Sequence, residues 1–176
     1  MESVTEDTTE LLIELTQADA VLCTCSTLGP LTDSLAKQYP DIIRVDRPLM
    51  ETATAYGSNV MVAICLESTR AATLSLLADC AEQAAKPVIP NLVLCDAAWP
   101  FFERGDTRGF ANQIATSIRA AINQSGRPDC IVLAQASMRT ATDDLTDLDI
   151  PILSSPALAA QRVLQIATST AEALNQ

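Results

Sequence analysis

The sequence predicts an α/β protein of two pseudo-symmetric lobes, each with a parallel sheet flanked by helices, and three observations point to this fold class. Short apolar runs alternate with amphipathic segments of about ten or more residues, the order expected of βαβ units. The apolar runs are continuous, as in strands covered by helices on both faces. The second half of the chain also repeats the order of the first. With 176 residues, 48% of them hydrophobic, the chain suits one domain or two small lobes that share an interface.

The first half of the chain is predicted to begin with a helix over residues 6–17, because Leu11, Leu12 and Leu15 recur at helical spacing. Pro48 in a first turn and Gly57 as a stop limit another helix. The elements expected after the first helix are, in order, a strand over 18–25, a helix over 31–39, a strand over 41–45, a helix over 47–57, a strand over 59–65 and a helix over 68–85.

The second half continues the alternation. Its first strand contains Pro90 and Asn91, which favour a sheet edge or a break. The segment AAWPFFERGD holds the one Trp and two of the three Phe, and we expect it to form a hydrophobic hinge or lid that packs one lobe on the other. The remaining elements are a strand over 87–95, a helix over 107–126 that ends at Gly126, a strand over 129–135, a short strand over 150–153 and a helix over 156–174.

Two pairs of segments suggest an internal repeat. ADAVLCTCST resembles PDCIVLAQAS, and about 20 residues later DIIRVDRPLM resembles DIPILSSPAL. Each copy reads as a strand, a polar tip, a helix, a short strand, two polar residues, a proline and a helix. We therefore expect lobe one to comprise residues 1–65 and 156–176 and lobe two residues 66–155, with a cleft between the lobes.

Composition excludes several classes of function. Lys and Arg total 11 against 22 Asp and Glu, a net charge of −11, which disfavours nucleic acid and anionic membrane surfaces as partners. The six cysteines lie in apolar runs and the start of the sequence lacks the pattern of a secretory signal, so we expect reduced thiols and a cytoplasmic location. The mean hydropathy is +0.20, yet no apolar stretch is long enough to span a membrane.

The absence of histidine removes Ser-His-Asp and Cys-His catalysis and most zinc sites. The CTC run is half a metal site at most, because the other cysteines lie on separate predicted strands. The five glycines form no phosphate-binding loop. We therefore expect neither a metal nor a nucleotide cofactor.

Polar residues gather at the predicted strand ends, where open α/β sheets bind ligands. Together with backbone N–H groups at the following helix starts, they would suit a carboxylate. Ser and Thr are also common helix N-caps, which explains each one taken alone. Arg47 and Arg70 follow strand ends and fit either an anion or a solvated surface. The four tips are Cys25-Ser26-Thr27, Glu67-Ser68-Thr69, Gln135-Ala136-Ser137 and Ser154-Ser155.

The two cysteines of CTC have different expected roles. We expect Cys23 to be a small residue of the hydrophobic core, as buried free cysteines often are. Cys25, followed by Ser-Thr and a turn, is the candidate reactive thiol, since a thiol among N–H donors at a helix start is held more as thiolate. A thiolate can act as base or nucleophile without histidine. A redox pair of Cys23 and Cys25 is a weaker alternative, because CxC on one strand is poorly placed for a disulfide.

The segments ADAVLCTCSTLGP, RVDRPLMETA, VAICLESTRAAT, AAWPFFERGD, VLAQASM and IPILSSP, in this order, resemble the aspartate/glutamate/hydantoin racemase superfamily over nearly the whole chain. The resemblance implies two α/β lobes with the active site between them and no cofactor. One cysteine from each lobe moves a proton on and off the carbon next to a carboxylate. Relatives decarboxylate malonates or isomerise maleate. Homodimers are common in the family, so a homo-oligomer is expected.

Carried over by position, the resemblance makes Cys25 the first-lobe catalytic cysteine. The second cysteine would fall at Ala136, so one face of the carbon lacks its proton carrier unless Ser137 or a water takes this role. Cys130 is a poor substitute, because it lies at the far end of the same predicted strand. Members of the family also normally start with a strand, whereas this sequence opens on a predicted helix. Either the first strand of lobe one is absent, which would leave a sheet edge open, or the given start is internal to a longer protein. The substrate-binding residues implied by the match or by the strand tips are Ser26, Thr27, Ser68, Thr69, Gln135 and Ser137.

Two functions follow from these residues. The first is a cofactor-independent isomerase or lyase that acts beside the carboxylate of a small or amino-acid-like substrate, with Cys25 as its single thiol. The second is a degenerate protein that binds a small carboxylate without turnover, as Ala136 and the short start suggest. The sequence leaves the substrate, and the choice between racemisation, decarboxylation and isomerisation, open.

Overall fold

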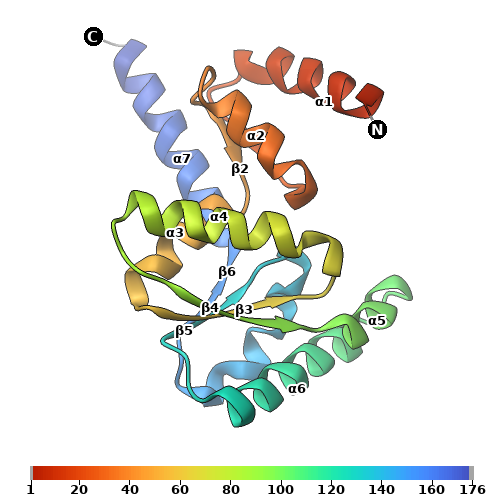
Figure 1. The fold of residues 1–176 in the computed structure, drawn as a ribbon. Helices are drawn as coiled ribbons and strands as arrows, with labels where there is room; N and C mark the ends of the chain where they lie inside the picture. Colours follow the sequence, from red (N-terminus) through yellow and green to blue (C-terminus); the bar gives the residue numbers. More distant parts are fainter. Residues whose placement is uncertain (1, 175–176) are drawn as a thin grey trace.

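The computed structural model describes residues 2–174, with the side chains of residues 6–25 and 27–169. Its strands form two sheets in which every described pairing is parallel (Figure 1). The predicted α/β class with helix-flanked parallel sheets is confirmed. The smaller sheet has the order β1-β2, from β1 (Val21–Cys23) and β2 (Ile42–Arg44). The larger has the order β4-β3-β5-β6, from β3 (Asn59–Ile64), β4 (Ile89–Leu94), β5 (Cys130–Leu133) and β6 (Ile152–Ser154).

Helices flank the strands, and short 3-10 helices follow most of them. The α-helices are α1 (Glu2–Glu14), α2 (Gly29–Ala36), α3 (Arg47–Tyr56), α4 (Arg70–Gln83), α5 (Trp99–Glu103), α6 (Thr107–Ser125) and α7 (Ser155–Leu174). The 3-10 helices are η1 (Leu15–Gln17), η2 (Ser26–Leu28), η3 (Glu67–Thr69), η4 (Asp96–Ala98), η5 (Ala136–Ala141) and η6 (Asp143–Leu148).

The central strand β3 explains the continuous apolar runs of the sequence. Successive side chains of a strand point to opposite faces of the sheet. Met61 and Ala63 pack on the face covered by α6, whereas Val60, Val62 and Ile64 pack on the face covered by α3 and α4. These five side chains are fully buried, because both faces carry helices. A strand in this position has no side that favours polar residues.

The edge strand and one helix end agree with the sequence signals. β4 pairs with β3 alone among the described strands, and Ile89 at its start is 68% exposed, so the edge predicted from Pro90 is confirmed. Helix α6 begins after Asp106, whose carboxylate accepts a hydrogen bond of 2.8 Å from the N–H of Gly109. It ends at Gly126, whose φ of 88° favours glycine.

The two sheets exchange helices, which gives the sequence repeat a structural counterpart. β2 of the smaller sheet leads into α3, which packs on β5 of the larger sheet. β6 of the larger sheet leads into α7, which contacts β1 of the smaller sheet and α3. Both helices have a proline at their second position, Pro48 and Pro156. In Figure 1 α7 runs from the larger sheet to the region of β2 and α2.

The pairing of the strands places the boundary between the two units before β3, and not at residue 65 as the sequence repeat suggested. β3 lies between β4 and β5, so residues 59–64 belong with the larger sheet, as does α3 before them. We call residues 2–46 the small unit and residues 47–154 the large unit. The hydrophobic core of the small unit includes a cluster of the buried side chains Leu12, Val21, Cys23 and Ile42, with partly buried side chains packed around them.

Candidate functional site

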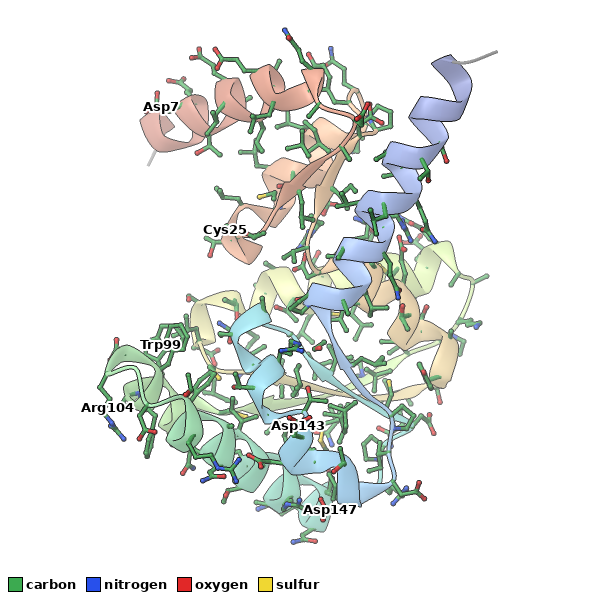
Figure 2. The ribbon with its side chains drawn as sticks, turned by 180° about the vertical axis from the view of Figure 1, so that it is seen from behind. Asp7, Cys25, Trp99, Arg104, Asp143 and Asp147 are labelled. Atoms are coloured by element: carbon green, nitrogen blue, oxygen red, sulfur yellow. The ribbon has the colours of Figure 1, made fainter. Side chains whose placement is uncertain are left out.

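Cys25 lies at the carboxyl end of the small unit's sheet. β1 ends at Cys23, which is buried as expected, and Cys25 two residues later is exposed. The carbonyl of Cys25 accepts a hydrogen bond of 3.1 Å from the N–H of Leu28, which closes the turn η2. In Figure 2 Cys25 lies at the end of the small unit that faces the large unit, and η2 contacts α4 there. The strand therefore presents one thiol to the space between the units.

The other cysteines are poor candidates for a reactive thiol. All five are buried, and all six cysteines are free. Burial raises the pKa of Cys65 to about 12, with the nearby Cys95 and Asp96 adding to the effect. Burial likewise raises the pKa of Cys80, Cys95 and Cys130 to about 11. Buried thiols that resist ionisation are inert, so Cys25 is the one thiol that the fold leaves accessible.

The turn after Cys25 carries the first pair of predicted binding residues. Thr27 is exposed on η2. The side chain of Ser26 lies outside the described residues. The turn leads directly into α2, whose Gly29 lies against the guanidinium of Arg44: a methyl group there would approach Nη1 to 2.8 Å. A close approach of this kind requires glycine, so Arg44 and Gly29 together fix the position of the turn.

The second hydroxyl-rich turn, η3, follows β3 in the large unit. Ser68 is exposed, whereas Thr69 is 6% exposed and its hydroxyl donates a 2.8 Å hydrogen bond to the carbonyl of Leu66. Thr69 is thus used within its own turn. Glu67 accepts two hydrogen bonds from Arg70, 2.5 and 2.8 Å long, and these lower the pKa of the carboxyl group. Of the predicted residues here, Ser68 has the accessible hydroxyl.

Gln135 links the carboxyl ends of two neighbouring strands. Its side-chain oxygen accepts a hydrogen bond of 2.6 Å from the N–H of Cys65, which follows β3. The side-chain amide nitrogen is then the group left for a ligand. Ala136 is exposed and Ser137 is half-buried at the start of η5. The structure therefore brings Ser68, Gln135 and Ser137 to one edge of the larger sheet.

The aromatic segment lies beyond the carboxyl end of the larger sheet. Trp99 follows β4 and marks the carboxyl end of the larger sheet; in Figure 2 it lies on the same side of the molecule as Cys25. The aromatic segment does not form the expected link between lobes. Trp99 and Phe102 stack with ring centroids 4.8 Å apart, and Phe102 contacts Phe110 of α6, because α5 packs on α6 at the end of the large unit (Figure 1).

Sequence reasoning missed an ionic network behind η2. Arg44 is 4% exposed and donates hydrogen bonds of 2.7 and 2.9 Å to Asp46, which is 2% exposed. Arg44 also pairs with Asp33 of α2. Arg47 donates hydrogen bonds to Asp33 of α2 at 2.7 Å and to Asp79 of α4 at 3.0 Å. Its guanidinium therefore links these two helices and is not free to bind an anion. The available signal was the spacing of Arg44 and Asp46, which lie two residues apart at the end of a strand.

The network lines a groove of ≈ 460 Å³ between α2 and α4. Arg44 and Arg47, which both line the groove, are already paired with Asp33, so neither guanidinium is free to bind a ligand there. Within the described part of the chain, no three His, Cys, Asp or Glu side chains are grouped as metal ligands. None of the described helices is both long and apolar enough to cross a membrane.

No protein-family model matches the chain, and no curated protein matches its sequence. The solved structures that match its fold include two enzymes. A cysteine variant of arylmalonate decarboxylase, in a sulfate-associated form, gives a TM-score of 0.60 at 14% identity, covering 94% of this chain and 75% of that one. Glutamate racemase from Francisella tularensis subsp. tularensis SCHU S4, in complex with D-glutamate, gives 0.66 at 12% identity, covering 93% of this chain and 62% of that one.

This chain thus spans less than two thirds of the length of that racemase. At these identities the likeness is one of fold. The resemblance that the sequence motifs suggest is confirmed at the level of the fold: the chain has the fold of an arylmalonate decarboxylase and of a glutamate racemase.

Proposed function

We propose that the chain is a cofactor-independent enzyme of the isomerase or lyase type, which moves a proton at the carbon next to the carboxylate of a small acid. Cys25 would supply the thiol. The observation that carries the proposal is that the fold exposes Cys25 alone among six cysteines, just beyond the carboxyl end of a parallel strand. Ligands of open α/β sheets bind at such ends. The likeness to a decarboxylase and to a racemase that binds D-glutamate supports the same chemistry.

The proposed roles follow from which of the described polar groups are free and, for Ser26, from its position in the sequence next to Cys25. The hydroxyls of Ser26, Thr27, Ser68 and Ser137 would hold the carboxylate, with the amide nitrogen of Gln135. Donors placed around a carboxylate also stabilise the enediolate that forms when negative charge develops beside it. Thr69, whose hydroxyl is engaged within η3, would shape that turn.

Ala136 favours chemistry on one face of the carbon. A racemase of two thiols needs an acid and a base on opposite faces, and a methyl group can be neither. Decarboxylation of a malonate suits a single thiol: the bond to one carboxylate breaks, carbon dioxide leaves, and the electron pair stays as an enediolate. The thiol of Cys25 then donates its proton to that carbon, and solvent returns a proton to the thiolate.

The same alanine supports a second candidate, a protein that binds small carboxylates without turnover. Cys25 would then line the binding site without transferring a proton. The two candidates differ in whether solvent hydrogen enters the ligand.

The test is to incubate the protein in D₂O with small malonates and with amino dicarboxylates, and to follow the Cα hydrogen by NMR. The proposal expects deuterium at Cα, in one configuration when the product is chiral. Cys25→Ala should lose this exchange but keep ligand-induced thermal stabilisation. Cys23→Ala is the matched control, since it removes a buried thiol two residues earlier, and should keep the exchange.

Full exchange in Cys25→Ala would overturn the assignment of the thiol. Thermal stabilisation of the wild type without any exchange would select the binding protein instead. If neither occurs with any of these acids, both candidates fall.

A further inference from the structure

Helices α2 and α4 belong to different units, and each directly follows a turn of the candidate site. The turn η2, which comes after Cys25, leads into α2, and the turn η3, which carries Ser68, leads into α4. In Figure 1 α2 of the small unit lies above α4 of the large unit, and both helices line the groove of ≈ 460 Å³. A shift of one helix relative to the other therefore moves Cys25 relative to Ser68.

Arg47 ties these two helices together from the first position of α3. Its Nη2 atom donates hydrogen bonds of 2.7 Å to Asp33 of α2 and of 3.0 Å to Asp79 of α4, and its Nε atom donates another of 3.0 Å to Asp33. Within residues 6–25 and 27–169, whose side chains the structure describes, no hydrogen bond or ion pair joins α2 to α4 directly. The polar link between the helices therefore runs through one guanidinium.

The exposure of this link distinguishes it from the buried pair next to it. The side chains of Arg47, Asp33 and Asp79 are partly exposed. Those of Arg44 and Asp46 are almost fully buried, and breaking that pair leaves a charge without water or partner, which destabilises the fold. Breaking the link at Arg47 leaves each carboxylate within reach of water, so the fold loses little and the two helices lose their tie.

We propose that Arg47 is a positioning residue of the candidate site. Its bridge from Asp33 to Asp79 holds α2 at a fixed position against α4. The bridge thereby sets the separation between the Cys25 thiol, which would transfer the proton, and the Ser68 hydroxyl, which would hold the carboxylate. This role rests on the proposed function, because reacting atoms must come within about 3–3.5 Å, and a misplacement of about 1 Å can slow a reaction by about a hundredfold.

The experiment measures this separation directly by dipolar EPR spectroscopy. Ser68→Cys supplies a second exposed thiol, and nitroxide labels are attached to it and to Cys25 in the folded protein, in which the other five cysteines are buried. Arg47→Met and Asp79→Ala, each made in this background, should lengthen or broaden the distance distribution between the labels. Asp79→Ala breaks only the α4 end of the bridge and removes a partly exposed side chain, so it decides the matter if Arg47→Met does not fold.

Two matched controls should keep the distance distribution of the parent protein. Arg119→Met removes an arginine that joins α6 to Asp147 of η6 within the large unit, and Asp79→Glu retains the carboxylate of the bridge. The proposal is overturned if the folded variants Arg47→Met and Asp79→Ala leave the distribution unchanged. It is also overturned if Arg119→Met changes the distribution as much, since the effect would then be a general loosening of the fold.

Solvent exchange separates this proposal from the proposed function. In unlabelled protein with a saturating concentration of an acid that the wild type exchanges, Arg47→Met and Asp79→Ala should slow deuterium incorporation at Cα by about tenfold or more. Arg119→Met should keep the wild-type rate. Equal rates in the bridge variants would overturn the positioning role. If the wild type exchanges no acid, the proposed function falls, and the EPR distances still decide whether Arg47 sets the separation.

Discussion

Replacing Arg44 with methionine should destabilise the protein strongly, because it removes the cation from a buried pair. Arg44 and Asp46 are 4% and 2% exposed and are joined by two parallel hydrogen bonds. Burial lowers the pKa of Arg44, but the hydrogen bonds and charges of Asp46 and Asp33 more than offset this and leave it raised. In Arg44→Met the carboxylate of Asp46 remains buried with no partner of opposite charge.

The size of the loss follows from the burial of both partners. Breaking a buried pair by removing one partner costs about 3–5 kcal/mol. Domains are stable by about 5–15 kcal/mol, so the loss is a large fraction of the total. For a chain of this size each kcal/mol lowers Tm by about 2–4 °C, which predicts a fall of about 6–20 °C.

Urea unfolding, followed by the fluorescence of the single Trp99 and by circular dichroism, measures this loss. Arg70→Met is the control: its ion pair with Glu67 is 41% and 61% exposed, and its removal should leave the urea midpoint nearly unchanged. The double variant Arg44→Met, Asp46→Leu should recover much of the loss, since no buried charge is then left unpaired. A loss for Arg44→Met as small as that for Arg70→Met would refute the reasoning.

Three further predictions concern packing and protonation. Gln135→Leu leaves the N–H of Cys65 without its acceptor and should cost about 1–3 kcal/mol in urea unfolding; an unchanged midpoint would contradict the 2.6 Å hydrogen bond. Folding raises the pKa of Cys65 to about 12 and of Cys95 to about 11, so their contribution to stability is full below about 8.5 and lost as pH rises through 11 to 12. Urea midpoints should fall over that window, and less steeply when both thiols are replaced by alanine. Gly57→Ala would bring a methyl group to 2.7 Å from Cβ of Asp129 and should cost about 1–3 kcal/mol; an unchanged urea midpoint would contradict this close packing.

The sequence was sufficient where one local rule decides the outcome. Continuous apolar residues at 59–64 require a strand buried on both faces, and β3 is such a strand. Pro90 has no N–H for a second neighbour, which suits the edge position of β4. Pro48 and Pro156 begin helices because their fixed φ suits a first turn.

The sequence was insufficient where the outcome depends on residues far apart in the chain. The hydrogen bond between Gln135 and the N–H of Cys65 joins residues 70 positions apart, so no local pattern predicts that its oxygen is unavailable to a ligand. The place of residues 47–64 in the large unit follows from strand pairing, which a repeat in the sequence does not specify. The aromatic segment packs on α6 because Phe110 faces it, a contact made only by folding.

The candidate site shows both situations. Cys23 and Cys25 have the same side chain, and the expectation that the first is core and the second exposed came from the Ser-Thr turn that follows, which ends the strand. That Thr69 is engaged while Ser68 is free depends on the backbone of η3, because only a turn of that shape brings the carbonyl of Leu66 to 2.8 Å from the Thr69 hydroxyl.

The most direct measurement is the alkylation rate of each cysteine across pH, resolved by peptide mass spectrometry, with and without small dicarboxylates. A reactive thiol in a carboxylate site predicts that Cys25 is modified first, that the five buried cysteines stay protected in the folded protein, and that dicarboxylates slow the modification of Cys25 alone. If Cys25 reacts no faster than the buried thiols, or if its reaction is indifferent to every carboxylate tested, the thiol is not part of such a site.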